Sequence, residues 1–200
     1  GVEFLFKKNK VTYIKGKGVL FSKNDVVVYE NNKKTSYKAK NIVIATGSSV
    51  ASLPGIEIDE KNIISSTGAL SLNDVPKKLA VIGGGYIGLE MGSVWSRLGS
   101  EVTVIEYLEY ITPGMDKEIS NEFKKILTKQ GIKFKMGSRV NNVKSSNTGV
   151  SINYTDLKSS REETLEFDKV LVSVGRKPYT EGLNLTKIGI KKDNKGRIEV

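Results

Sequence analysis

Three glycines of one short motif have the spacing that dinucleotide binding requires. Residues 83–88 read Gly-Gly-Gly-Tyr-Ile-Gly and fit the pattern G-x-G-x-x-G. In such a turn the first glycine, Gly83, permits a tight bend, and the second, Gly85, lets the backbone approach a pyrophosphate. The third, Gly88, lets a helix pack closely on the preceding strand. The motif therefore predicts a turn that binds phosphate groups.

Glu106, farther along the chain, has the chemistry to select the nucleotide. A carboxylate at the end of the next strand accepts hydrogen bonds from both hydroxyls of the adenine ribose, and it repels a 2′-phosphate. The helix after the turn would offer its free N–H groups and the positive end of its dipole to the phosphates. These residues predict binding of NAD rather than NADP.

The segments around the motif have the patterns of the elements that would position it. Residues 79–82 form a short apolar run, typical of a buried parallel strand, and residues 86–98 repeat apolar side chains at helical spacing. Gly99 is expected to end the helix, and residues 101–105 predict a second strand that ends at Glu106. A glycine motif alone is weak evidence. Here the predicted strand before it, the predicted helix after it and the acid at the end of the next strand all agree with it, and together they favour NAD binding. An ordinary βαβ turn with an incidental acid is the alternative.

The composition excludes several kinds of chemistry within this chain. The 200 residues, 38% of them hydrophobic, predict globular material of one or two domains. There is no cysteine and no histidine. Disulfides, thiol catalysis and histidine bases are therefore excluded, and we expect no metal site. No apolar run is long enough to span a membrane, so no membrane association is expected.

The formal charge of +10, from 32 basic and 22 acidic residues, raises the alternative of nucleic-acid binding. Residues 1–40 hold ten lysines, but these are scattered through alternating segments with no arginine among them. A solvated lysine-rich surface explains this distribution better, and we expect no nucleic-acid partner.

The remaining segments predict strands and helices in a definite order. Before the motif we expect strands at 11–14, 19–21, 26–29, 35–38 and 41–47, and a short helix at 65–70 capped by Ser65. After Glu106 we expect a helix from Asp116 to Gln130, whose apolar stripe is Ile119, Phe123, Ile126 and Leu127. A third parallel strand at 132–134, an antiparallel meander at 140–143, 149–154 and 164–167, and a strand at 169–175 complete the pattern.

The order of elements repeats, which suggests two nucleotide-binding domains in series. The meander, apolar strand and glycine of residues 138–175 echo those of residues 11–47, but only the second copy has a glycine fingerprint upstream. We therefore expect residues 1–62 to be the C-terminal part of a split nucleotide-binding domain without its fingerprint, which the family resemblance given next implies to be an FAD-binding domain. Residues 63–178 would be the NAD-binding domain, and residues 179–200 would return to the first domain. A complete protein with a β-rich N-terminus is the alternative.

Three motifs give the chain a family resemblance. Ala45-Thr-Gly47, the glycine motif at 83–88 and Val174-Gly-Arg176-Lys-Pro178 occur in the order found in the two-domain flavoprotein disulfide reductases, the pyridine nucleotide-disulfide oxidoreductases. Residues 65–70, 75–78, 83–90, 92–99 and 103–106 resemble the dihydrolipoyl dehydrogenase branch of that family. The resemblance implies an α/β fold, in which a Rossmann-like parallel sheet carries an antiparallel meander, flanked by incomplete β-rich pieces of an FAD domain.

The resemblance also implies which residues bind the two cofactors, NAD and FAD. Tyr86 matches the position that covers the flavin, and Glu90 matches a glutamate that pairs with a lysine near the redox disulfide. Val140 would lie against the adenine, and Gly175 near the nicotinamide. The expected NAD residues are Gly83, Gly84, Gly85, Tyr86, Ile87, Gly88, Leu89, Glu90, Glu106, Val140 and Gly175. The expected FAD residues are Gly18, Thr46, Gly47 and Ser48.

Three features of the family are missing from this sequence: the FAD fingerprint, the cysteine pair of the redox disulfide, and the histidine–glutamate pair of the dimerisation domain. No catalytic residue is therefore expected in this chain, and the chain alone is expected to be inactive. The resemblance implies a parent enzyme that oxidises protein-bound dihydrolipoamide through a disulfide and FAD, with NAD⁺ as acceptor. Its cofactors do the redox chemistry, and this segment would position the nicotinamide.

The resemblance implies a homodimeric parent that works within a 2-oxo acid dehydrogenase or glycine cleavage complex on a lipoyl domain. It would be cytoplasmic in a bacterium and located in the mitochondrial matrix in a eukaryote. The alternatives are another flavoprotein disulfide reductase, an NADH oxidase, or, from a different functional class, a non-catalytic nucleotide-binding module.

Overall fold

The computed structural model describes residues 1–200 and divides into two compact units. Unit 1 comprises residues 1–49 and 177–200, and unit 2 comprises residues 50–176. The first boundary lies before Val50 rather than before Ile63, where the sequence pattern suggested it. The reason is that Ile56 is buried in the core of unit 2 with Ile63, and Leu53 packs against the same core.

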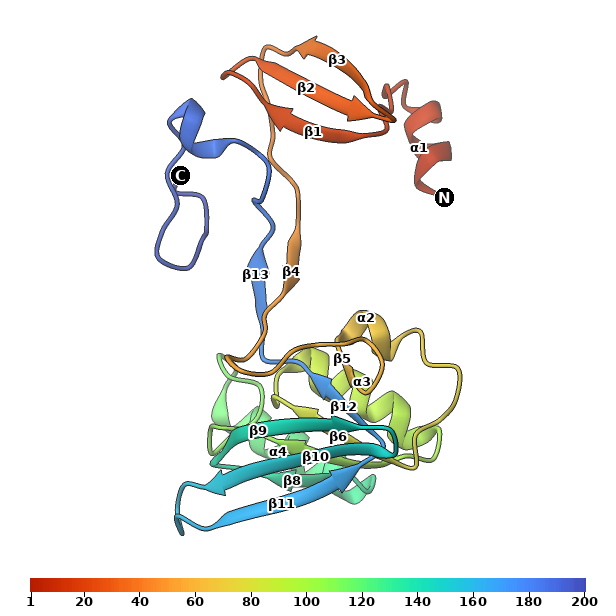
Figure 1. The fold of residues 1–200 in the computed structure, drawn as a ribbon, viewed down its shortest axis with the longest axis vertical. Helices are drawn as coiled ribbons and strands as arrows, with labels where there is room; N and C mark the ends of the chain where they lie inside the picture. The colour runs from red at the N-terminus through yellow and green to blue at the C-terminus, as the bar shows by residue number, and fades with distance from the viewer. The chain divides into compact units, whose positions relative to one another are not determined.

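Unit 2 is built around five parallel strands (Figure 1). Their spatial order is β5 (Ile63–Ile64), β12 (Lys169–Val172), β6 (Lys78–Ile82), β7 (Glu101–Ile105) and β8 (Lys133–Lys135). The register pairs Ile82 with both Ile105 and Val172, so that β6, β7 and β12 end at the same level. The loops that follow these three strands therefore meet at one edge of the sheet, where α/β folds bind their ligands.

Three helices cover one face of this sheet: α2 (Ser66–Ala69), α3 (Tyr86–Arg97) and α4 (Lys117–Lys129). Their ends confirm the predicted caps. The Ser65 side chain accepts from the N–H of Thr67, and Asp116 accepts from the first turn of α4. Gly99 ends α3 with a φ of 110°, a backbone conformation that glycine adopts without strain.

An antiparallel meander covers the other face, formed by β9 (Ser138–Ser146), β10 (Gly149–Asp156) and β11 (Glu162–Phe167) (Figure 1). Side chains alternate across a strand. Leu79 and Val81 of β6 therefore pack against the helices, and Ala80 and Ile82 pack against the meander. This explains why residues 79–82 are apolar without interruption: both faces of β6 are buried. The mixed α/β architecture predicted from the sequence is confirmed.

A polar cluster joins the meander to the parallel sheet at β8. The Tyr154 hydroxyl donates a hydrogen bond to the Glu163 carboxylate, and the Lys135 ammonium lies 3.1 Å from the same carboxylate. The Tyr154 hydrogen bond, followed by that of Lys135, holds the pKa of Glu163 below its ordinary value of 4.5. The cluster thus favours the ionised form of Glu163 in the folded protein.

This cluster predicts a specific loss of stability in acid. A carboxyl whose folded pKa is depressed contributes stability that is present above its unfolded pKa and is lost as the pH falls through its folded pKa. Below pH 4.5 the wild-type urea midpoint should therefore decline more steeply than that of Glu163→Gln. Urea unfolding at neutral pH and in acid, followed by circular dichroism, measures the difference. Parallel declines in the two proteins would contradict it.

Unit 1 holds α1 (Val2–Lys8) and a three-stranded antiparallel sheet of β1 (Lys17–Leu20), β2 (Asp25–Glu30) and β3 (Lys33–Lys38). Residues 177–200, which include the short 3₁₀ helix η1 (Leu185–Ile188), belong to the same unit. Its small core contains Leu20, Leu183 and Leu185. The two connections to unit 2 run through β4 (Ser48–Val50) and β13 (Arg176–Pro178), which pair with each other.

Four details of the sequence prediction were wrong. Residues 11–14 and 41–47 are not strands. In the second segment Ile42 and Ile44 pack against the core of unit 1, but no strand lies alongside to form a ladder. The strand expected at 169–175 ends at Val172. In the expected apolar stripe of α4 only Leu127 is buried, whereas Ile119, Phe123 and Ile126 are exposed.

No helix of the structure combines the length and the apolar character that crossing a membrane requires.

Candidate functional site

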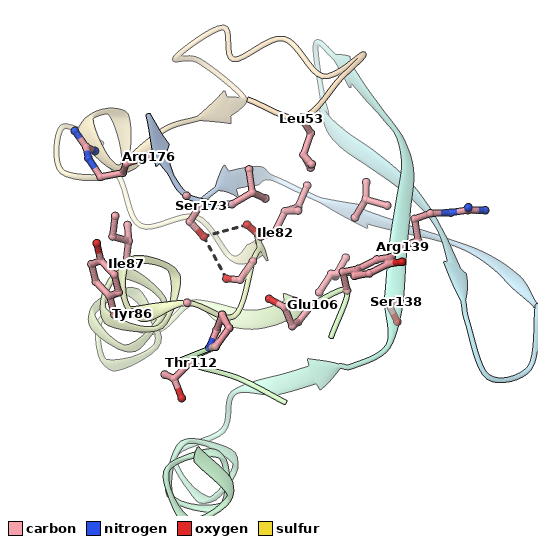
Figure 2. Close-up of a pocket in the computed structure, with 18 of the residues that line it drawn as sticks. Leu53, Ile82, Tyr86, Ile87, Glu106, Thr112, Ser138, Arg139, Ser173 and Arg176 are labelled. Carbon is pink, nitrogen blue, oxygen red and sulfur yellow. Dashed lines mark hydrogen bonds between the residues drawn. The ribbon is translucent and has the colours of Figure 1, made fainter. Parts of the chain in front are cut away.

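A cavity of about 470 Å³ lies at the carboxyl ends of β6, β7 and β12 (Figure 2). Its walls come from the loops after these strands and from the start of β9. Ile82 and Ile105 supply an apolar floor, and Glu106 supplies a carboxylate. The volume lies within the usual range of small-molecule and cofactor sites. These residues come together because β6, β7 and β12 end at the same level of the sheet.

The turn after β6 requires glycine at its first position. Gly83 has a φ of 107°, and a Cβ added there would lie 2.6 Å from the carbonyl oxygen of Ser173. The Ser173 hydroxyl donates to the carbonyl oxygens of Ile82, at 3.0 Å, and Gly83, at 3.2 Å (Figure 2). Ser173 therefore ties the loop after β12 to the glycine turn.

Gly85 leaves open space where a phosphate group would approach. A Cβ added at Gly85 would meet no atom within 4 Å, and the residue lines the cavity. No hydrogen bond within the chain uses the N–H groups of Gly85, Tyr86 or Ile87. These groups lie at the N-terminus of α3, where the helix dipole favours an anion. The turn thus has the donors and the space that a pyrophosphate needs.

Gly88 serves the packing of α3 on the sheet. A Cβ added there would lie 2.4 Å from the carbonyl oxygen of Gly83 and 2.5 Å from the hydroxyl oxygen of Ser173. Any side chain at this position would therefore push the helix away from the turn. Gly83 and Gly88 thus have the structural uses that their spacing predicts, and the space that the predicted approach of a pyrophosphate to Gly85 requires is open.

Glu106 is held in place by backbone donors. Its side chain is largely buried, and its carboxylate accepts hydrogen bonds from the N–H of Gly84, at 2.5 Å, and of Leu108, at 2.8 Å. A carboxylate offers about four lone-pair sites. Glu106 therefore retains acceptor capacity toward the cavity that it lines, which is what two ribose hydroxyls require. No group of acidic, histidine or cysteine side chains in the structure could hold a metal ion.

The structure brings most of the expected NAD residues to the cavity, but not all of them. Those that line it are Gly83, Gly85, Tyr86, Ile87, Glu106, Val140 and Gly175. Gly84 and Gly88 lie behind this surface and shape the turn, as their contacts show. Leu89 is buried in the core under the helices, so its side chain is unavailable to a ligand in the cavity. Glu90 is exposed and does not line the cavity.

The expected FAD residues lie in unit 1. Gly18 is in β1, and Ser48 begins β4. The Thr46 hydroxyl donates to the carbonyl oxygen of Tyr179, at 2.5 Å, and Gly47 has a φ of 73°. Their contact with a flavin stays a prediction.

Among the cavity residues that sequence reasoning missed are Thr112, Ser138 and Ser173. Ser173 follows the last residue of β12 and Ser138 is the first residue of β9. Their positions at strand ends could have drawn attention to them, because the loops at this edge of a parallel sheet carry the ligand. For Thr112 no local pattern indicates a position near the glycine turn.

Comparisons with known proteins agree over the whole chain. The family model described as pyridine nucleotide-disulphide oxidoreductase matches residues 1–200. A dihydrolipoamide dehydrogenase of Chaetomium thermophilum is 60% identical over 200 residues, which are 99% of this chain and 40% of that protein. Dihydrolipoyl dehydrogenase 1, mitochondrial, of Arabidopsis thaliana is 56% identical over 201 residues, 100% of this chain and 40% of that protein. The chain thus spans about 40% of the length of these relatives.

A solved structure has the same fold at lower identity. The HOCl-induced flavoprotein disulfide reductase RclA from Escherichia coli is similar with a TM-score of 0.83 and 27% sequence identity. The match covers 100% of this chain and 46% of that one.

Proposed function

Because the chain belongs to the pyridine nucleotide-disulphide oxidoreductase family, we propose that the cavity of unit 2 binds NAD(H). Within this family, the dihydrolipoyl dehydrogenases use FAD and NAD. Gly85, Tyr86 and Ile87 donate their free N–H groups to the pyrophosphate. Val140 lies against the adenine, and Gly175 lies near the nicotinamide; both line the cavity. Bound NAD supplies hydride chemistry, and this chain's residues bind and orient it.

The position of Glu106 is the observation that carries the proposal. Its carboxylate stands beside the glycine turn at the end of β7, and two backbone N–H groups fix it there. A fixed carboxylate is complementary to the vicinal hydroxyls of the adenine ribose. A 2′-phosphate would bring a second negative charge against it at short distance, which is unfavourable. The site therefore prefers NAD to NADP.

We propose dihydrolipoamide oxidation, with NAD⁺ as acceptor, as the activity of the protein to which this chain contributes. The identities of 60% and 56% with proteins named for this activity support it. Unit 1 supplies part of an FAD site through Gly18, Thr46, Gly47 and Ser48. Tyr86, two-thirds exposed at the cavity, covers the flavin side of the nicotinamide site. Since the sequence has no cysteine, the redox disulfide is not formed by these residues.

We further propose the cellular setting of this activity. A homodimer acts within a 2-oxo acid dehydrogenase or glycine cleavage complex, and its substrate is the dihydrolipoyl group of a lipoyl domain. One similar protein, from a plant, is named as mitochondrial, and another comes from a bacterium. The matrix or the bacterial cytoplasm is the corresponding compartment.

Calorimetric titration with NAD⁺ and, in parallel, NADP⁺ tests the proposed cavity function directly. Oxidised nucleotides avoid the reduction of any bound flavin. Saturable binding with a clear preference for NAD⁺ is expected. A preference for NADP⁺ would overturn the role of Glu106 and favour another branch of the family. Absence of binding at millimolar concentrations of both would mean that the glycine turn serves the fold alone.

Replacing Glu106 by alanine should weaken NAD⁺ binding roughly tenfold to a hundredfold. The loss of charge-assisted hydrogen bonds to the ribose costs on the order of 1.5–3 kcal/mol. Binding of NADP⁺ should fall less, because the repulsion of its 2′-phosphate is removed as well. Glu109→Ala is the matched control, since it removes the same charge from a residue that does not line the cavity. Equal NAD⁺ affinities in the two variants would refute the ribose role.

A further inference from the structure

The loop of residues 107–115, which follows β7, packs directly against the glycine turn. Ile111 is almost fully buried and belongs to the core under the helices. A Cβ added at Gly84 would lie 3.2 Å from the Cγ2 atom of Ile111. Thr112, the next residue, is 5% exposed and lines the cavity. The loop therefore forms a support for the turn rather than a loose connection.

Thr112 links the turn to helix α4 by two hydrogen bonds. Its backbone N–H donates to the carbonyl oxygen of Gly84 at 2.8 Å. Its hydroxyl lies 2.8 Å from the hydroxyl of Ser120, which is 1% exposed on the first turns of α4. Thr112 also has a φ of 50°, which is unfavourable for a β-branched residue. The surrounding contacts hold it in this conformation.

These bonds determine the orientation of the Gly84–Gly85 peptide. In a planar trans peptide the C=O of one residue and the N–H of the next point in opposite directions, and the chain contains no cis peptide. Because Thr112 holds the carbonyl of Gly84, the N–H of Gly85 points to the side opposite Thr112, where it has no partner within the chain. Glu106 holds the N–H of Gly84. The N–H and the C=O of Gly84 are thus both hydrogen-bonded to residues of the segment that follows β7.

We propose that Thr112 and Ser120 are positioning residues for the pyrophosphate of the dinucleotide. The bond between their hydroxyls holds the 107–115 loop so that Thr112 sets the direction of the Gly85 N–H. This inference rests on the proposed binding of NAD in the cavity. Although Thr112 lines the cavity, Figure 2 shows its hydroxyl turned away from the cavity, so this hydroxyl acts through the turn and not by touching the ligand.

The Thr112→Val variant tests this role because it removes the hydroxyl and nearly preserves the shape. We expect its affinity for NAD⁺ and for ADP to fall about two- to tenfold, as one oriented phosphate donor is weakened. Its affinity for adenosine, which has no phosphate, should stay the same. Thr112→Ser keeps the hydroxyl and should bind all three ligands like the wild type. Thr128→Val is the matched control, since Thr128 is an exposed residue of α4 outside the cavity.

The ligand series separates the possible failures. If the wild type binds neither NAD⁺ nor ADP, the proposed function itself fails. If the wild type binds NAD⁺ but Thr112→Val loses affinity for adenosine as much as for ADP, the two hydroxyls serve only the general structure of the loop, and the inference is overturned. Unchanged affinities in Thr112→Val overturn it as well. The double variant Thr112→Val/Ser120→Ala should show no further loss for ADP, because either change alone breaks the same bond.

Discussion

The Gly85→Val protein should bind NAD⁺ about a hundredfold more weakly than the wild type while remaining folded. The structure leaves open space at the Cβ position of Gly85, so the valine side chain would collide with the ligand and not with the protein. Gly85 has φ −78° and ψ 176°, an extended conformation that suits a β-branched residue. Loss of two charge-assisted phosphate bonds, at about 1.5 kcal/mol or more each, gives an effect of this size.

Two measurements together decide this prediction. Calorimetric titration gives the NAD⁺ affinity, and urea unfolding gives the stability. Because valine is a poorer N-cap than glycine, the free energy of unfolding should fall by no more than about 1 kcal/mol. Gly92→Ala, on the same helix but outside the cavity, should leave the affinity unchanged. If Gly85→Val binds NAD⁺ like the wild type, the phosphate does not lie at this turn.

The Gly88→Ala protein should lose stability, by about 1–3 kcal/mol or more in the free energy of unfolding. Its new methyl group would lie 2.4 Å from the carbonyl oxygen of Gly83, 2.5 Å from the hydroxyl oxygen of Ser173 and 2.9 Å from the Cγ1 atom of Val81. Overpacking of a well-filled interior costs this much even when neighbours shift. The contact with the Gly83 carbonyl is with backbone, so relief requires movement of the turn or the helix.

Gly92→Ala is again the informative comparison, one helical turn farther along α3. Its Cβ would lie 3.3 Å from the Cγ1 atom of Val102, a tight contact that a small side-chain movement relieves. Alanine gains up to about 1 kcal/mol of helix propensity over glycine, which offsets part of this cost. Urea midpoints should therefore separate the two variants clearly. Equal midpoints would show that the close approach of α3 to the turn is not needed for stability.

Local signals in the sequence were sufficient for much of unit 2. The unbroken apolar run at residues 79–82 predicted a strand buried on both faces, and the two cores confirm it. Asp116 and Ser65 cap their helices because capping needs only residues two or three positions away. The glycine spacing and Glu106 likewise belong to one continuous segment from β6 to β7. This segment contains the part of the site that local patterns predicted, whereas Val140 and Gly175, which also line the cavity, were implied by the family resemblance.

The failures arose where a long-range partner decides the outcome. Residues 41–47 have the composition of a strand, yet a strand also needs a neighbour to form a ladder, and none lies alongside. The period of α4 showed which face is apolar, but Leu127 alone of the expected stripe is buried. Hydrophobic periodicity reports the chemistry of a face and not whether another element covers it. Leu89, which the family resemblance implied as an NAD residue, belongs to the core and not to the cavity.

By itself, the sequence determined the type of site: a glycine turn between a strand and a helix, with an acid at the end of the next strand. Its zero counts of cysteine and histidine also determined which chemistry these residues cannot do. Only the tertiary structure decided which groups support the turn. Ser173 reaches it from β12, and Thr112 reaches it from the loop after β7 with Ser120 of α4 behind it. These residues meet because β6, β7 and β12 end at one level, and that register depends on pairing between strands distant in the chain.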